Sequence, residues 1–105
     1  MAGNPPDRWV SADALRQAFN DGHYWERAQA GSLQEHLKTR RHRKNPTANL
    51  PLCTHSEVYE YRDQQGARVA IVHLMRLPDG SIGATGRPDP KLLLIDGVVW
   101  HMLKP

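Results

Sequence analysis

The sequence predicts an α+β fold, in which N-terminal short helices are followed by an antiparallel β-sheet of three to five strands. Helix signals, namely a capping serine and apolar residues one turn apart, occur in the first part of the chain. Runs rich in β-branched residues follow a segment that contains two prolines. We therefore expect one domain over 1–105, with a helical part over about 9–44, a joint at 45–51 and a sheet part over 52–105.

The first helix is expected over about 12–20. Ser11 is a suitable N-cap, and Val10 and Leu15 are spaced to form a hydrophobic contact across the first turn. A glycine after an Asn-Asp pair ends this helix, because glycine tolerates the backbone geometry of helix C-termini. A second helical element is then predicted over 23–30.

A third helix is predicted from about Leu33 into the basic run QEHLKTRRHRK. Ser32 and Glu35 have the spacing of a capping box, and Leu33 and Leu37 lie one helical turn apart. The prolines that follow would prevent this helix from continuing. The basic residues would then lie at the C-terminal end of a helix, where the helix dipole favours cations.

Ala67–Leu77 is the longest apolar run with many β-branched residues, and a turn signal stands at each end. We interpret it as the central strand, preceded by a half-exposed strand over about 56–62. Both of its alternating sets of side chains are largely apolar, which predicts that both faces of the sheet are covered. His73 interrupts one set, so we expect it to have a polar partner or to lie at the rim.

The remaining strands have mixed signals. A third strand is predicted over 81–86, weakened by its glycines. The Asp-Pro pair at 89–90 has the form of a helix start, yet the aliphatic residues of 91–95 also suit a strand, and the sequence leaves both open. The Asp-Gly pair at 96–97 predicts a tight turn before a final strand over 98–103.

Basic residues are concentrated in one segment. The 105-residue chain has a net charge of +3, and five of its 14 lysines and arginines lie within seven positions: Lys38, Arg40, Arg41, Arg43 and Lys44. The other nine are outnumbered by the 11 acidic residues. We therefore expect a small interaction protein that binds nucleic acid, DNA or RNA, without sequence specificity through this basic helix end.

The sequence carries no signal for secretion or for membrane insertion. The N-terminus lacks a basic region followed by an apolar run, and the longest aliphatic stretch is four residues, Leu92–Ile95. The single cysteine, Cys53, cannot form an intramolecular disulfide. A cytoplasmic location and no membrane partner are the corresponding expectations.

The C-terminal part, from Tyr59 onward, carries the runs VAIVH, LPDGSIG, GRPDPK and IDGVVW. In these runs the chain resembles a family of small uncharacterised bacterial proteins, some of them phage-associated. The resemblance covers a little under half of the chain. It implies a shared fold and no particular activity, because Asp-Gly, Pro-Asp-Gly and Asp-Pro are mainly signals of backbone geometry.

A metal site is one candidate for chemistry. Cys53 and His55 form a Cys-x-His pair, and His73 and His101 could supply further ligands. Structural zinc sites usually combine four ligands in close pairs, and no second pair with suitable spacing occurs. We therefore predict neither a metal nor a cofactor.

A metal-independent ribonuclease is the alternative function. In such enzymes two histidines exchange protons at a phosphate while arginines stabilise the developing charge. The candidate catalytic residues are His55, His73, His101, Arg76 and Arg87. The sequence leaves open whether the protein is an enzyme, with a binding protein favoured.

A protein–protein adaptor is the third hypothesis. Aromatic residues are frequent anchors of protein interfaces. Four of them would form the contact surface: Tyr24, Trp25, Tyr59 and Tyr61. In this case the basic segment would only increase solubility.

Overall fold

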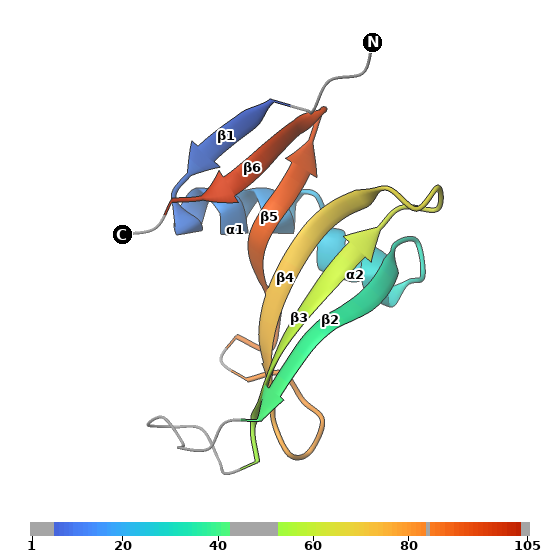
Figure 1. The fold of residues 1–105 in the computed structure, drawn as a ribbon, viewed down its shortest axis with the longest axis vertical. Helices are drawn as coiled ribbons and strands as arrows, with labels where there is room; N and C mark the ends of the chain where they lie inside the picture. The colour runs from blue at the N-terminus through green and yellow to red at the C-terminus, as the bar shows by residue number, and fades with distance from the viewer. Residues whose placement is uncertain (1–5, 43–52, 84, 104–105) are drawn as a thin grey trace.

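The computed structural model describes residues 6–42, 53–83 and 85–103. Within these ranges the chain forms two helices and a sheet of six strands (Figure 1). The elements are β1 (Asp7–Val10), α1 (Ala12–Asp21), α2 (Tyr24–Gln29), β2 (Gln34–His42), β3 (His55–Arg62), β4 (Arg68–Arg76), β5 (Asp89–Ile95) and β6 (Val98–Met102). Neither described helix has the length and apolar character needed to cross a lipid bilayer.

The strands lie in the order β1-β6-β5-β4-β3-β2, so β1 and β2 are the edges of the sheet. Neighbouring strands are antiparallel, except for β1 and β6, which are parallel. The α+β class is as predicted, but the described sheet is mixed and has more strands than expected. The additional strands, β1 and β2, come from the N-terminal part of the chain, where the sequence predicts no strand.

The first two of the three predicted helices are confirmed, as α1 and α2. The Ser11 hydroxyl accepts a hydrogen bond at 3.1 Å from the backbone N–H three residues later, which is the capping geometry expected for α1. Leu15 and Phe19, one turn apart, are the buried residues of α1. The Tyr24 hydroxyl of α2 donates to the backbone carbonyl of Leu94 at 3.0 Å and joins this helix to β5.

The basic run after Leu33 is a strand, and the predicted third helix is wrong. Glu35 of β2 pairs with Tyr61 of β3, and it accepts a hydrogen bond from Gln29 instead of capping a helix. The expected apolar helix face is absent from β2, because Leu33 is buried while Leu37 is 49% exposed. Pairing with β3 therefore outweighs the local helix signals.

Residues 91–95, for which the sequence leaves both helix and strand open, belong to strand β5. The Asp-Pro pair at 89–90 does not begin a helix. Pro90 lies opposite Val72 beside a register shift, a place where a strand tolerates a residue without an N–H. The predicted Asp-Gly turn at 96–97 is present, with φ values of 49° and 77°. It joins β5 and β6 as a tight hairpin.

The strand predicted over 81–86 is not formed. Among its described residues, Ile82 makes an isolated bridge to Arg76, and the others lie in turns or irregular backbone. Gly80 and Gly86 have φ values of 89° and 79°, which belong to turns. The glycines of this segment therefore favour turns and irregular backbone over a regular strand.

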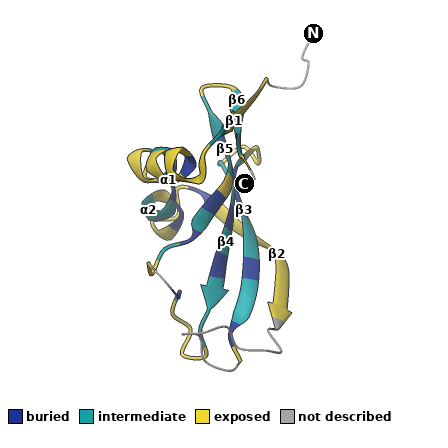
Figure 2. Ribbon diagram, turned by 90° about the vertical axis from the view of Figure 1, so that its left-hand side faces the viewer, coloured by how far each residue is buried: buried dark blue, intermediate teal, exposed yellow. Residues whose placement is uncertain are grey.

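Both α1 and α2 lie on one side of the sheet (Figure 2). The core between them and the strands consists of Leu15, Phe19, Tyr24, Ala28, Leu33, Tyr61, Ala70, Val72 and Leu93. On the opposite side, which we call the open face, Ile71 and Met75 of β4 are only half-buried. The prediction that both faces are covered is therefore wrong, because the described helices leave this side to solvent.

Replacing Leu93 with alanine should reduce the free energy of unfolding by about 2–5 kcal/mol, because the side chain fills the core and its loss leaves a cavity. Urea unfolding followed by circular dichroism measures this. Leu103→Ala is the matched control, since Leu103 is 53% exposed and its loss should cost less than about 0.5 kcal/mol. Equal losses in the two variants would contradict the assigned core.

Candidate nucleic-acid interface

Strand β3 carries two buried carboxylates on opposite faces. The side chains of Glu57 and Glu60 are 4% and 8% exposed, and they lie three positions apart on the strand. A buried, ionised carboxylate is costly unless cations and hydrogen-bond donors surround it. Both glutamates obtain these partners from β3 itself and from the neighbouring strands.

On the open face, Glu60 is paired with Arg62 at 2.5 Å and with Arg68 at 3.8 Å. The hydrogen bond from Arg62 holds the pKa of Glu60 below its usual value, and the charges of Lys38 and Arg68 act in the same direction. The carboxylate is therefore ionised at neutral pH and keeps the arginines in place.

Irregularities in two strands create this cluster. Regular alternation would place Arg68 with Ala70 on the helix side. A register shift at the end of β3 instead sets Arg62 opposite Arg68, within reach of Glu60. A second shift, in the middle of β2, leaves Lys38 outside the regular pairing with β3.

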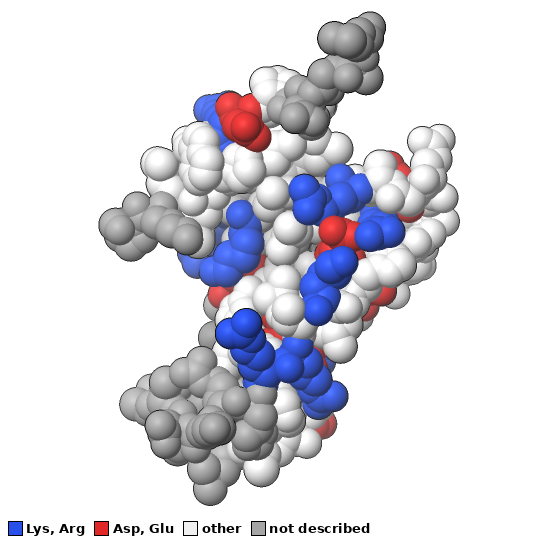
Figure 3. Space-filling model, viewed as in Figure 1, with Lys and Arg blue, Asp and Glu red and all other residues white. Residues whose placement is uncertain are grey.

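Arg41 extends the cluster along the edge strand. It lies opposite Ser56 of β3, whose hydroxyl bonds to His73 on the open face. Lysine and arginine side chains gather over β2, β3 and β4 on this face (Figure 3). We call Lys38, Arg41, Arg62 and Arg68 the open-face basic patch. These four positive charges exceed the single negative charge of Glu60 by three.

On the helix side, Glu57 has a similar set of partners. It is paired with Arg40 at 3.2 Å and with Arg76 at 3.1 Å, and the Tyr59 hydroxyl donates to it at 3.0 Å. These residues line a groove of about 570 Å³ together with His55. The groove is a second place where two arginines share one carboxylate.

The predicted basic segment is therefore divided between two faces. Successive residues of a strand point to opposite sides, so Arg40 reaches Glu57 while Arg41 lies on the open face. Lys38 is near Glu60 on the open face. Arg43 and Lys44 lie outside the described residues, as does the proline-containing joint at 45–51.

The three candidate catalytic histidines lie at separate places. His55 is on the helix side, opposite Arg76, whereas His73 is on the open face with its Nε2 atom 2.7 Å from the Ser56 hydroxyl, so the polar partner expected for His73 is present. His101 shares the open face but belongs to β6, two strands from β4 and so about 10 Å away across the sheet. The described structure does not bring two of them to one phosphate.

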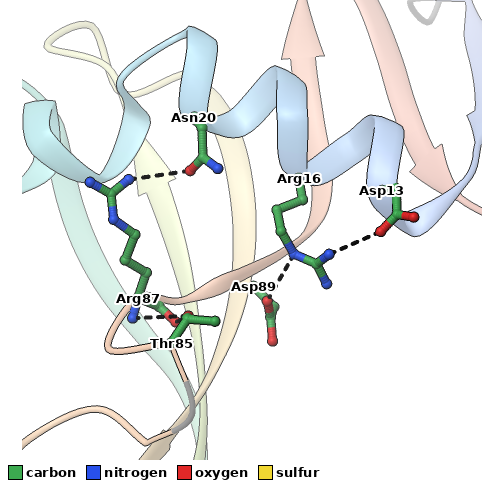
Figure 4. Close-up of polar contacts among 6 residues, drawn as sticks. All are labelled: Asp13, Arg16, Asn20, Thr85, Arg87 and Asp89. Atoms are coloured by element: carbon green, nitrogen blue, oxygen red, sulfur yellow. Dashed lines mark hydrogen bonds and ion pairs between the residues drawn. The ribbon is translucent and has the colours of Figure 1, made fainter.

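The two candidate catalytic arginines make contacts within the fold. Arg76 donates to Glu57 and to the backbone carbonyl of Gly80. Arg87 reaches Asn20 of α1 (Figure 4), pairs with Glu26 of α2 at 2.6 Å, and lies over a tryptophan ring of the same helix. Arg87 thereby ties the loop before β5 to both helices.

Within the described residues, no group of three or more His, Cys, Asp or Glu side chains is arranged to hold a metal ion. Cys53 is exposed, and it lines the groove together with His55. His73 is on the other face and His101 on a distant strand. The four residues considered as ligands from the sequence therefore do not form one site.

The aromatic residues of the adaptor hypothesis are divided between core and surface. Tyr24 and Tyr61 are buried in the core, and burial raises the pKa of both hydroxyls. Trp25 and Tyr59 are half-buried and line a cavity of about 140 Å³ between α2 and the sheet. The four rings do not form a common exposed surface.

Sequence reasoning missed three residues of the open face. Arg62 and Arg68 flank the turn between β3 and β4, and pairing these two strands as a hairpin would have placed them side by side. Trp9 belongs to β1, a strand too short to give a periodic signal. It is 58% exposed on the edge of the sheet.

Comparison with known proteins gives no identification: no protein-family model, curated protein or solved structure matches the chain. The resemblance of the C-terminal part to small bacterial and phage-associated proteins stays a prediction.

The stability supplied by Glu60 should depend on pH. Its pKa is lowered in the folded state, so its contribution is present above the unfolded-state pKa of about 4.3 and is lost as the pH falls through the lower folded-state value. Wild type should exceed Glu60→Gln in urea stability at pH 7, and the difference should shrink below about pH 4.

The control is Glu35→Gln, which makes the same chemical change at an exposed position of β2. Its effect on the free energy of unfolding at pH 7 should be smaller than that of Glu60→Gln. A difference between wild type and Glu60→Gln that stays constant from pH 7 to pH 3 would contradict the role given to the carboxylate.

Proposed function

We propose that the protein binds nucleic acid, without sequence specificity, through the open-face basic patch. The observation that carries the proposal is the excess of three positive charges on a sheet face that the described helices leave uncovered. Phosphate groups are the complementary ligands for such an array. The proposed ligand is thus the one expected from the sequence, nucleic acid, but the proposed binding surface is a face of the sheet and not the end of a helix.

The buried glutamate makes the arginines better suited to this task. Arg62 and Arg68 are held by Glu60, yet their side chains remain 37% and 49% exposed. An arginine already fixed in position loses less conformational freedom when it binds a phosphate. Lys38 and Arg41 are exposed and add charge along the same edge.

Contacts of this kind recognise the sugar-phosphate backbone. Arginine and lysine bound to phosphates fix position and carry no direct information about base sequence. The affinity should therefore fall steeply with salt, since each neutralised phosphate releases counterions.

A salt titration tests the proposal. The affinity for a fluorescein-labelled single-stranded oligonucleotide is measured by fluorescence anisotropy at several salt concentrations. If the patch contacts phosphates, the logarithm of the association constant should fall against the logarithm of the salt concentration with a slope of about −2 to −3. In Lys38→Gln/Arg41→Gln the slope should become less steep by about 1 to 1.5, because two contacts are removed.

The matched control is Arg16→Gln/Arg27→Gln, which removes the same charge from exposed positions on α1 and α2. Its slope should equal that of wild type. Equal changes in both double variants, or no binding by wild type at low salt, would contradict the proposal. Cleavage of an RNA oligonucleotide that disappears in His73→Leu would instead support the ribonuclease alternative, because that mechanism needs the 2′-hydroxyl.

A further inference from the structure

Trp9 is exposed on the open face at the edge strand β1. Its side chain is on the side of the sheet opposite the core, because its neighbour Val10 packs against the core and Trp9 pairs with His101. With 58% of its surface exposed, it is an unusually accessible large apolar side chain.

The Trp9 ring is held in a defined orientation. It stacks on the ring of His101, with centroids 4.5 Å apart and planes inclined by 20°. The His101 Nε2 atom is in turn 2.8 Å from the Asp7 carboxylate, which belongs to the same strand as Trp9. The indole is therefore positioned before any ligand arrives, and much of its surface remains free.

Trp9 is also aligned with the basic patch. The strand registers place one residue of each strand in a single row across the open face: Trp9, His101, Leu92, Ile71, Glu60 and His36, from β1 to β2. The row begins at an exposed aromatic ring, crosses half-buried aliphatic side chains and ends among the arginines around Glu60. Four strand spacings, about 19 Å, separate Trp9 from Glu60.

We infer that the ligand of the open face is single-stranded nucleic acid, with one base stacked on Trp9 and its phosphates directed to the basic patch. This inference rests on the proposed function. A single strand exposes the faces of its bases, and stacking on an aromatic ring tolerates any base. A duplex keeps those faces covered, so it could use the cations but not the tryptophan.

The geometry agrees with a short, flexible ligand. Proteins that bind single strands without specificity combine a positively charged path with aromatic platforms, and they cover about 4–16 nucleotides per domain. The row provides the platform and the charges on one face, with an apolar strip between them that suits bases better than phosphates. An oligonucleotide of about ten residues is long enough to test the whole row.

The experiment compares wild type with Trp9→Ala and Trp9→Tyr. The ligands are oligothymidine and oligouridine of about ten nucleotides, and a DNA duplex of equal length. Trp9→Ala should weaken binding to both single strands by about 10- to 100-fold and change duplex binding less than about twofold. Trp9→Tyr should restore most of the affinity, because it keeps an aromatic face.

The salt dependence separates stacking from charge. Trp9→Ala should keep the wild-type slope, since it removes no phosphate contact. The control is Leu37→Ala, which removes a 49% exposed apolar side chain from the helix side of β2 and should leave affinity unchanged. Thermal melts establish that each variant is folded.

The outcomes distinguish the two proposals. Single-strand binding that is unchanged in Trp9→Ala, while Lys38→Gln/Arg41→Gln still reduces the slope, would overturn the stacking inference and leave the proposed function intact. Tighter binding to the duplex than to the single strands by wild type would also overturn it. If wild type binds none of the three ligands, both proposals fail.

Discussion

The fold depends on the pairing of two glutamates buried in β3. Each carboxylate would destabilise the sheet if left alone, so each must be surrounded by cations. Glu57 forms ion pairs with Arg40 of β2 and Arg76 of β4, and Glu60 forms an ion pair with Arg68 of β4. Glu57 thereby joins both β2 and β4 to β3 on the helix side, and Glu60 joins β4 to β3 on the open face. Because each has more than one cationic partner, the same interaction that stabilises the sheet leaves fixed positive charge on its surface.

The one-sided arrangement of the helices determines where that charge is accessible. Both α1 and α2 lie against the core face, and on that side the residues around Glu57 line a groove between the strands and the turn that follows β4. Those around Glu60 lie on a sheet surface that the described chain does not cover. The aliphatic side chains of Ile71 and Leu92 remain half-buried there. A partly apolar, partly cationic face of this kind suits a ligand that has both flat apolar groups and phosphates.

Local signals predicted the elements whose geometry depends on near neighbours. The cap at Ser11 and the turn at 96–97 require only a few adjacent residues, and both are present. The helix predicted for the basic run is wrong because its apolar residues have helical spacing, whereas β3, the strand with which it pairs, is distant in sequence. Lys38 and Arg41 were identified as basic residues from the sequence alone. The hairpin between β3 and β4 predicts that Arg68 lies beside Arg62, but the face of the sheet that Arg68 occupies depends on a register shift that no local pattern reveals.

The change from helix to strand also changes what the basic residues can recognise. A helix would present its cations as a narrow stripe with a rise of about 1.5 Å per residue, a shape that fits the groove of a duplex. On a sheet, cations of one face are about 4.8 Å apart between strands and nearly 7 Å apart along a strand. This spacing forms a shallow, two-dimensional array, which is wider than the stripe of a single helix. A flexible single strand can follow such an array, whereas a rigid duplex meets only a part of it.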